Sequence, residues 1–156
     1  LPGAVISDDQ SIFNISETDF DEVVDLNLKG TLLPSIVFGK PMSEKGKGAI
    51  VNYSSMTVKQ AMTRVVGYSS GKAAMENFTR WMAVEMAIKF GDGIRVNAVS
   101  PGTIDTPFHA QIKSTKPEVF ASWKNNIMLG RLGQPEEVAS VVSFLASKNA
   151  SNTLSS

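Results

Sequence analysis

Residues 49–53 read Ala-Ile-Val-Asn-Tyr and residues 94–99 read Ile-Arg-Val-Asn-Ala-Val, and these two runs decide the fold class. Both are short, rich in β-branched and apolar residues and bounded by turn sequences, so each predicts a buried strand. Between them, residues 67–90 repeat apolar side chains at helical spacing. Strands separated by a long helix have to pair in parallel through a right-handed crossover. This stretch therefore predicts an α/β fold.

The segment before the first strand extends the same pattern. Residues 1–16 are rich in turn residues and predict a loop, whereas residues 18–45 carry an apolar stripe that predicts a helix. Ser16 and Asp19 fit the cap and the first turn of this helix. Pro34 lies inside the pattern and is expected to kink or split the helix.

The segment after the second strand is less regular. Residues 103–130 hold two prolines and scattered lysines, and they are too long for a plain connection, so we expect a substrate lid there. Pro135 then opens a last helix, with Glu136 and Glu137 in the first turn, where the helix dipole favours acids.

Composition excludes several kinds of site. Hydrophobic residues make up 42% and charged residues 19% of the chain, as in an ordinary globular domain. Fifteen basic residues balance fifteen acidic ones, so no overall charge draws the chain to nucleic acid or to an anionic membrane. With no cysteine and one histidine, His109, we expect neither a disulfide nor a metal site. No membrane-spanning run or signal peptide is visible, so the expected location is the cytoplasm.

Tyr68 and Lys72 are a candidate catalytic pair. They are four residues apart on a predicted helix, so their side chains share one face. A lysine ammonium about 4 Å away would attract a tyrosine phenolate by roughly 4 kcal/mol, which corresponds to a pKa lowered by up to about three units. Such a tyrosine suits general acid–base catalysis near neutral pH. Considered alone, a Tyr-xxx-Lys pair is common on helices and more often has no catalytic role.

Ser55 adds a polar group near this pair. It follows the first strand, and the second strand ends similarly at Pro101-Gly102. Ligand sites in open α/β sheets form beyond the carboxyl ends of the strands, so these residues, Tyr68 and Lys72 can meet in one crevice. The alternative is a strand-end serine that satisfies local backbone groups.

Four signatures, in this order, resemble those of the short-chain dehydrogenase/reductase family. They are residues 26–30 (Leu-Asn-Leu-Lys-Gly), 50–55 (Ile-Val-Asn-Tyr-Ser-Ser), 68–74 (Tyr-Ser-Ser-Gly-Lys-Ala-Ala) and 95–102 (Arg-Val-Asn-Ala-Val-Ser-Pro-Gly), and residues 131–139 fit the family's late helix. The resemblance covers essentially the whole chain. It implies the C-terminal portion of a Rossmann-like, doubly wound parallel sheet that lacks the family's first strands and last strand.

The resemblance implies a role for each matching residue. Tyr68 would exchange a proton with the substrate, Lys72 would lower the pKa of Tyr68 and hold the nicotinamide ribose, and Ser55 would hydrogen-bond the substrate oxygen. Asn27 would hold a water molecule of a proton relay, although an asparagine inside a helix can also be a local kink. Cofactor contacts are further implied for Pro101, Gly102, Ile104 and Thr106.

The implied cofactor is NAD or NADP, and the implied partners are a small-molecule substrate and further copies of the chain. A dimer or tetramer would be built on the helices at 18–45 and 67–90. The family's glycine-rich, phosphate-binding turn is not found, because Gly46-Lys47-Gly48 precedes a strand. We therefore expect the sequence to be part of a longer chain. The alternative function is a non-catalytic fragment or scaffold that binds no cofactor.

Cations between Ser55 and Tyr68 indicate an acidic substrate. Lys59 and Arg64 lie in this loop, where Arg64 could bind a carboxylate through two hydrogen bonds, and His109 begins the lid. Residues 52–56 and 64–68 are also similar to the sugar-acid branch of the family. Together they predict a substrate such as D-mannonate, D-fructuronate or gluconate. The alternative is that Lys59 and Arg64 are solvated surface charges.

Overall fold

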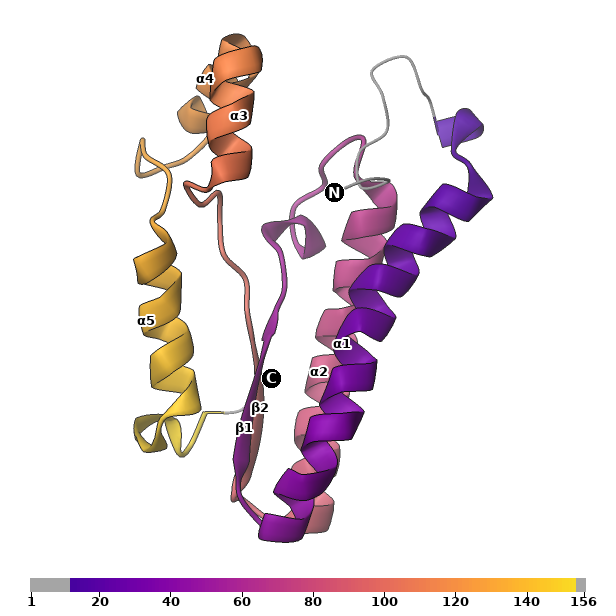
Figure 1. Ribbon diagram of the computed structural model, residues 1–156, viewed down its shortest axis with the longest axis vertical. Coiled ribbons are helices and arrows are strands. Elements are labelled where there is room, and N and C mark those ends of the chain that lie inside the picture. The colour runs from indigo at the N-terminus through magenta and orange to yellow at the C-terminus, as the bar shows by residue number, and fades with distance from the viewer. Residues whose placement is uncertain (1–11, 154–156) are drawn as a thin grey trace.

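β1 (Gly48–Tyr53) and β2 (Ile94–Val99) lie at the centre of the structure, a computed structural model that describes residues 12–153. The strands pair in parallel, in register from Gly48 opposite Ile94 to Tyr53 opposite Val99. α1 (Glu17–Lys45) and α2 (Val66–Phe90) cover one face, and α5 (Pro135–Ala146) covers the other (Figure 1). The α/β class, the parallel pairing and the partial Rossmann-like architecture predicted from the sequence are confirmed.

α1 is one continuous helix of 29 residues. Ser16 caps it by accepting a hydrogen bond from the Asp19 amide at 3.3 Å, as predicted. Pro34 lies within the helix and does not split it, so a break there is excluded. Packing along α2 stabilises the helix across the hydrogen bond that proline removes. Of the predicted loop at 1–16, residues 12–14 form a short 3-10 turn and residues 1–11 lie outside the described part.

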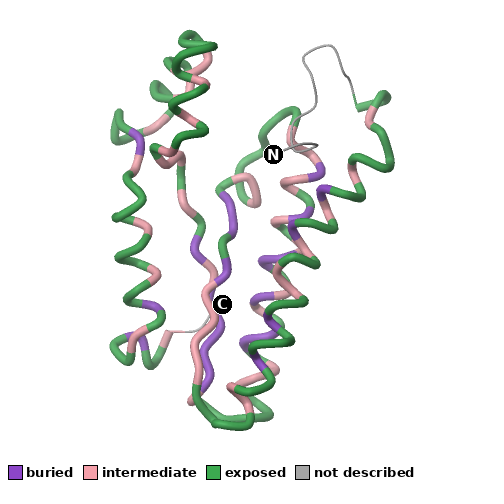
Figure 2. The backbone as a smooth tube through the Cα atoms, viewed as in Figure 1, coloured by how far each residue is buried: buried purple, intermediate pink, exposed green. Residues whose placement is uncertain are grey.

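The core consists of two apolar clusters, one on each face of the strands. Met82, Ala83 and Val96 are buried together on the α2 side, and Val99, Leu145 and Ala150 on the α5 side. Figure 2 shows buried residues along β2 and on the inward faces of α1 and α2, whereas β1 is mostly half-buried. The alternation of strand side chains explains this division, because Ile50 packs on the first cluster and Val51 on the second.

The segment predicted as a lid contains two short helices. α3 (Pro107–Thr115) and α4 (Pro117–Asn125) each begin with a proline, and they lie beyond the carboxyl ends of the strands (Figure 1). Short 3-10 turns follow β1 at Met56–Val58 and α5 at Lys148–Ala150. Within residues 12–153, no helix has the length and apolar character needed to cross a bilayer, and no His, Cys, Asp and Glu side chains gather as a metal site.

Candidate active site

The carboxyl ends of the two strands are joined side by side. The Ser54 amide donates to the Val99 carbonyl at 2.7 Å, which continues the strand pairing one residue past β1. Ser55 follows at once on the first strand and Pro101 comes two residues after Val99 on the second. The two segments that the sequence assigns to the site therefore lie at one edge of the sheet, as predicted for an open α/β fold.

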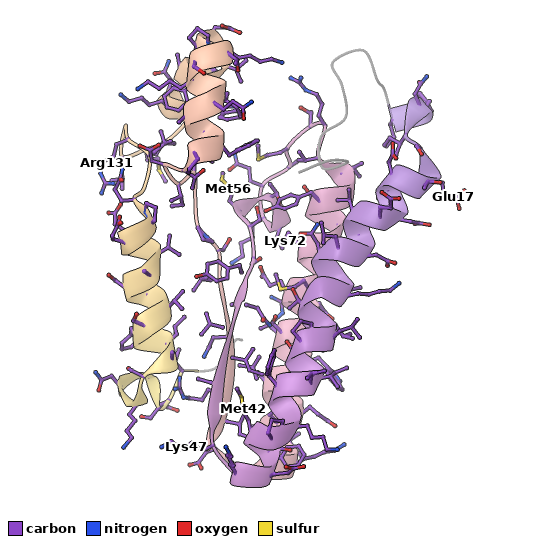
Figure 3. All side chains as sticks on the ribbon, viewed as in Figure 1. Glu17, Met42, Lys47, Met56, Lys72 and Arg131 are labelled. Atoms are coloured by element: carbon purple, nitrogen blue, oxygen red, sulfur yellow. The ribbon has the colours of Figure 1, made fainter. Side chains whose placement is uncertain are left out.

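Tyr68 and Lys72 lie on the first turns of α2, beside this edge. The Lys72 Nζ is 5.7 Å from the centre of the Tyr68 ring and donates to the Tyr53 carbonyl oxygen at 2.7 Å. Figure 3 labels Lys72 near the carboxyl end of β1. Burial lowers the pKa of the Lys72 ammonium from its ordinary value of 10.5, because a charge is less stable away from water. The structure therefore places the two predicted groups together and fixes the lysine to the end of β1.

Ser55 is buried at the start of the 3-10 turn that follows β1. Its Oγ accepts hydrogen bonds from the Thr57 amide at 3.3 Å and from the Thr57 hydroxyl at 3.1 Å. These bonds are the local role that the sequence alternative described. A hydroxyl still has one donor when it accepts two bonds, so the Ser55 hydrogen can be directed at a substrate oxygen.

Asn27 lies on α1, opposite the turn of α2 that contains Tyr68 and Lys72. The residue is 9% exposed, and its Nδ2 donates to the Val23 carbonyl one turn back at 2.8 Å. A Cβ added at Gly71 would lie 2.9 Å from the Asn27 Cβ, so only glycine permits this approach of the helices. Gly71 lies between Tyr68 and Lys72 in the sequence. Asn27 on α1 is therefore at the same height along α2 as Tyr68 and Lys72.

The other predicted cofactor residues lie around the end of β2. Pro101, Gly102 and Ile104 line a cavity of about 550 Å³ that α5 closes on one side. Ile104 also forms a short parallel bridge with Gly133.

Thr106 is not part of the lining of that cavity. Its hydroxyl lies 2.9 Å from His109 Nδ1 at the start of α3. His109 itself packs edge-on against Trp123 of α4, with ring centres 5.9 Å apart, so it has a structural contact between α3 and α4.

The two candidate substrate cations lie between the 3-10 turn and α2, and both are exposed. Arg64 has a φ of 67°, in the left-handed region where side chains other than glycine are uncommon. Lys59 is close enough to Glu76 to help lower the pKa of that carboxyl group.

Glu76 was not predicted from the sequence. It is 8% exposed, and its Oε2 accepts a hydrogen bond from the Ser54 hydroxyl at 2.5 Å, while its Oε1 accepts from Arg80 at 2.9 Å. The Ser54 bond is the main reason that the pKa of Glu76 lies below its ordinary value, and Arg80 adds to the effect. One signal was present in the sequence, because positions 68, 72 and 76 repeat every four residues and share a helix face.

Arg131 and Glu137 form an ion pair at the start of α5. The Arg131 guanidinium donates to both carboxylate oxygens of Glu137, at 2.7 and 2.8 Å, and the Gln134 amide donates to the same carboxylate at 2.7 Å. These bonds, Arg131 first, lower the pKa of Glu137 from 4.5 to about 2. The carboxylate thus completes the capping box of α5 and ties Arg131 to the first turn of this helix.

Glu137→Gln is expected to reduce the loss of folding stability that occurs as the pH falls into the acid range. Since the folded-state pKa is lowered, the stability contributed by Glu137 is present above 4.5 and is lost as the pH falls through about 2. Urea unfolding across this pH range measures the effect, and Glu136→Gln removes a charge from the same turn as a matched control. An unchanged acid limb in Glu137→Gln would contradict the assignment.

The chain matches known proteins in sequence and in fold. Residues 3–155 match a family model described as enoyl-(acyl carrier protein) reductase. The chain is 37% identical over 146 residues to the uncharacterized oxidoreductase UxuB of Bacillus subtilis, covering 91% of this chain and 51% of that protein. It is 37% identical over 140 residues to galactitol 2-dehydrogenase (L-tagatose-forming) of Cereibacter sphaeroides, covering 86% and 54%.

A solved structure matches the fold over nearly the whole chain. It is a proposed NAD(P) dependent gluconate 5-dehydrogenase from Beutenbergia cavernae with bound NADP at low occupancy. The TM-score is 0.85 at 31% sequence identity, covering 98% of this chain and 59% of that one. The chain thus spans about half the length of the curated relatives that it matches.

Proposed function

Because this chain belongs to the short-chain dehydrogenase/reductase family, we propose that it carries the catalytic part of an NAD(P)-dependent oxidoreductase. The reaction interconverts a hydroxyl and a carbonyl group on a small polar substrate. The observation that supports the proposal is the contact of Lys72, which lies near the Tyr68 ring, with the Tyr53 carbonyl at the end of β1, two residues before Ser55.

The residues present fit the nicotinamide end of such a cofactor. The cavity next to Pro101 and Gly102 is of the size that small ligands occupy, and it lies at the carboxyl edge of the strands. A bound nicotinamide supplies or accepts the hydride. Ser55 donates a hydrogen bond to the reacting oxygen, and Tyr68 passes the proton to or from it. Lys72 holds the nicotinamide ribose beside Tyr68, and Asn27 supports the proton path from the α1 side.

The proposed substrate class is a sugar acid. Arg64 and Lys59 support an anionic group next to the site, and the resemblance to D-mannonate oxidoreductase and gluconate 5-dehydrogenase favours D-mannonate, D-fructuronate or gluconate. The family model's description raises acyl thioesters as a rival class. Turnover assays on the full-length protein, following the absorbance of the reduced nicotinamide, compare these acids with galactitol and with acetoacetyl-CoA. Turnover of the thioester alone would overturn the sugar-acid proposal.

Arg64→Ala is expected to raise KM for the sugar acid and to leave KM for a neutral polyol unchanged. A hydrogen-bonded ion pair contributes about 1.5–3 kcal/mol, so the rise should be roughly 10- to 100-fold. Steady-state kinetics with both substrates measure it, and the polyol serves as the internal control for altered folding at this strained position. An unchanged KM for the acid would contradict the carboxylate role of Arg64 and favour a solvated surface charge.

A nicotinamide titration separates this proposal from the alternative of a non-catalytic scaffold. Saturable binding of NAD or NADP to the full-length protein is expected, and no binding over a millimolar range would favour the scaffold.

We also propose self-association through α1 and α2. Trp81, Val84 and Ile88 form an exposed apolar stripe on α2, 57–77% exposed, which a second copy can cover. Sedimentation of Ile88→Glu against the parent protein tests this.

A further inference from the structure

The proposed reaction does not use the buried carboxylate of Glu76. The groups around this carboxylate show which part of the structure it stabilises. The side chain lies on the face of α2 that meets the end of β1, one helical turn beyond Lys72. One of its oxygens binds the Ser54 hydroxyl and the other binds Arg80. Carboxylates are rarely buried unless they are paired in this way, because burial of an unpaired charge is costly.

The Ser54 hydroxyl makes one of three hydrogen bonds that join side chains of α2 to the end of β1. Asn52 Nδ2 donates to the Thr79 hydroxyl at 2.9 Å, the Tyr53 carbonyl accepts from Lys72 at 2.7 Å, and Ser54 donates to Glu76. Three consecutive residues of the strand end are thus each bound by a different side chain of the same helix. Ser55 is the next residue, and the chain turns there into the 3-10 turn.

We propose that Glu76 is a positioning residue that sets Ser55 against Tyr68 by holding the Ser54 hydroxyl. Ser54 is the last residue tied to the sheet, through its amide to Val99, before the chain turns. Its side chain and its amide together fix the direction in which Ser55 leaves the strand. The inference rests on the proposed function, since it deepens the part that Ser55 has in the reaction. Arg80 and Lys59, the cations that act on Glu76, keep the carboxylate in its accepting, ionised form.

Glu76→Leu in the full-length protein is expected to lower kcat by about 10- to 100-fold, because misplacing a catalytic group by about 1 Å can cost about 100-fold. Glu76→Gln keeps an oxygen that can accept from Ser54 and should retain most of the activity. Ser54→Ala removes only the hydroxyl partner and should reproduce the loss, even where Glu76→Leu folds poorly. Glu85→Leu removes a carboxylate from an ion pair with Lys89 farther along α2 and is the matched control.

A double-mutant cycle separates positioning from a general structural role. In a Ser55→Ala background the group that Glu76 positions is already gone, so adding Glu76→Leu should change kcat little further. Equal fold-losses in the two backgrounds would overturn the proposal, as would a Glu76→Leu enzyme with unchanged kcat.

Amide hydrogen exchange gives a readout that needs no substrate. Glu76→Leu should accelerate exchange in residues 53–58 and leave β2 unchanged, whereas unaltered exchange in residues 53–58 overturns the inference. Absence of nicotinamide binding by the parent protein would instead overturn the proposed function. The exchange result still decides whether Glu76 holds the strand end, so the two failures can be told apart.

Discussion

Tyr68→Phe in the full-length protein is expected to lower kcat by about 10²- to 10⁴-fold, the range that general acid–base catalysis contributes. The variant loses only the hydroxyl that transfers the proton. The ring remains in place near the Lys72 ammonium, 5.7 Å from Nζ, and the lysine keeps its bond to the Tyr53 carbonyl. Thermal stability and nicotinamide affinity should therefore stay close to those of the parent. Steady-state kinetics, thermal unfolding and a nicotinamide titration measure the three quantities.

Ser70→Ala is the matched control for Tyr68→Phe. It removes an exposed hydroxyl from the same turn of α2 and should leave kcat unchanged. A Tyr68→Phe enzyme that keeps more than about a tenth of the parent kcat would contradict the assignment of Tyr68 as the proton-transfer group, since even the smallest expected effect is larger.

The strands and long helices could be predicted because each has a strong local signal. β1 and β2 are apolar runs between turns, and α1 and α2 repeat apolar residues over 29 and 25 residues. Pro34 shows the limit of such reasoning, because the packing of α1 against α2 outweighs a local preference for breaking the helix. The two helices in the segment predicted as a lid, α3 and α4, are nine residues each and bury no residue completely, so periodicity could not identify them. The prolines at their first positions were the available signal.

The site could be predicted only in part, for a related reason. Tyr68 and Lys72 share a helix face by spacing alone, and Ser55 follows a strand, so simple geometry brings them to one edge. Glu76 could not be found in this way, because glutamate on a helix is normally solvated and nothing local shows that Ser54 lies opposite. The pairing spans 22 residues and exists only once α2 has packed on β1. Likewise, the contact of His109 with Thr106 and Trp123 follows from lid packing.

Lys72→Met is the second change with a large expected effect, and its signature is loss of activity without loss of stability. Without the ammonium, nothing at this position supports the proton transfer by Tyr68 or holds the nicotinamide ribose in the proposed mechanism. We expect kcat/KM to fall by about 10²- to 10⁴-fold, as for loss of the acid–base group that Lys72 supports. Kinetics on the full-length protein and thermal unfolding of the same samples measure the two effects.

The expected stability follows from the direction of the Lys72 pKa shift. Burial lowers this pKa below 10.5, so the unfolded chain binds the proton more tightly than the folded one. The charged form therefore opposes folding at neutral pH, and this opposition disappears as the pH rises toward 10.5. Methionine has a similar length and no charge, so the removal of this cost opposes the loss of the bond to the Tyr53 carbonyl. The variant should therefore unfold close to the parent at neutral pH.

Lys89→Met supplies the comparison within the same helix. Lys89 is an exposed lysine in the last turn of α2, paired with Glu85, and its loss should affect neither kcat nor the unfolding temperature by much. A Lys72→Met protein that unfolds well below the parent would mean that the bond to the Tyr53 carbonyl holds the fold together. Lys72 would then be a structural residue, and the loss of activity could not be assigned to chemistry. A variant that is stable, folded and inactive would instead indicate that the Lys72 ammonium serves catalysis, although its burial at the end of β1 opposes folding.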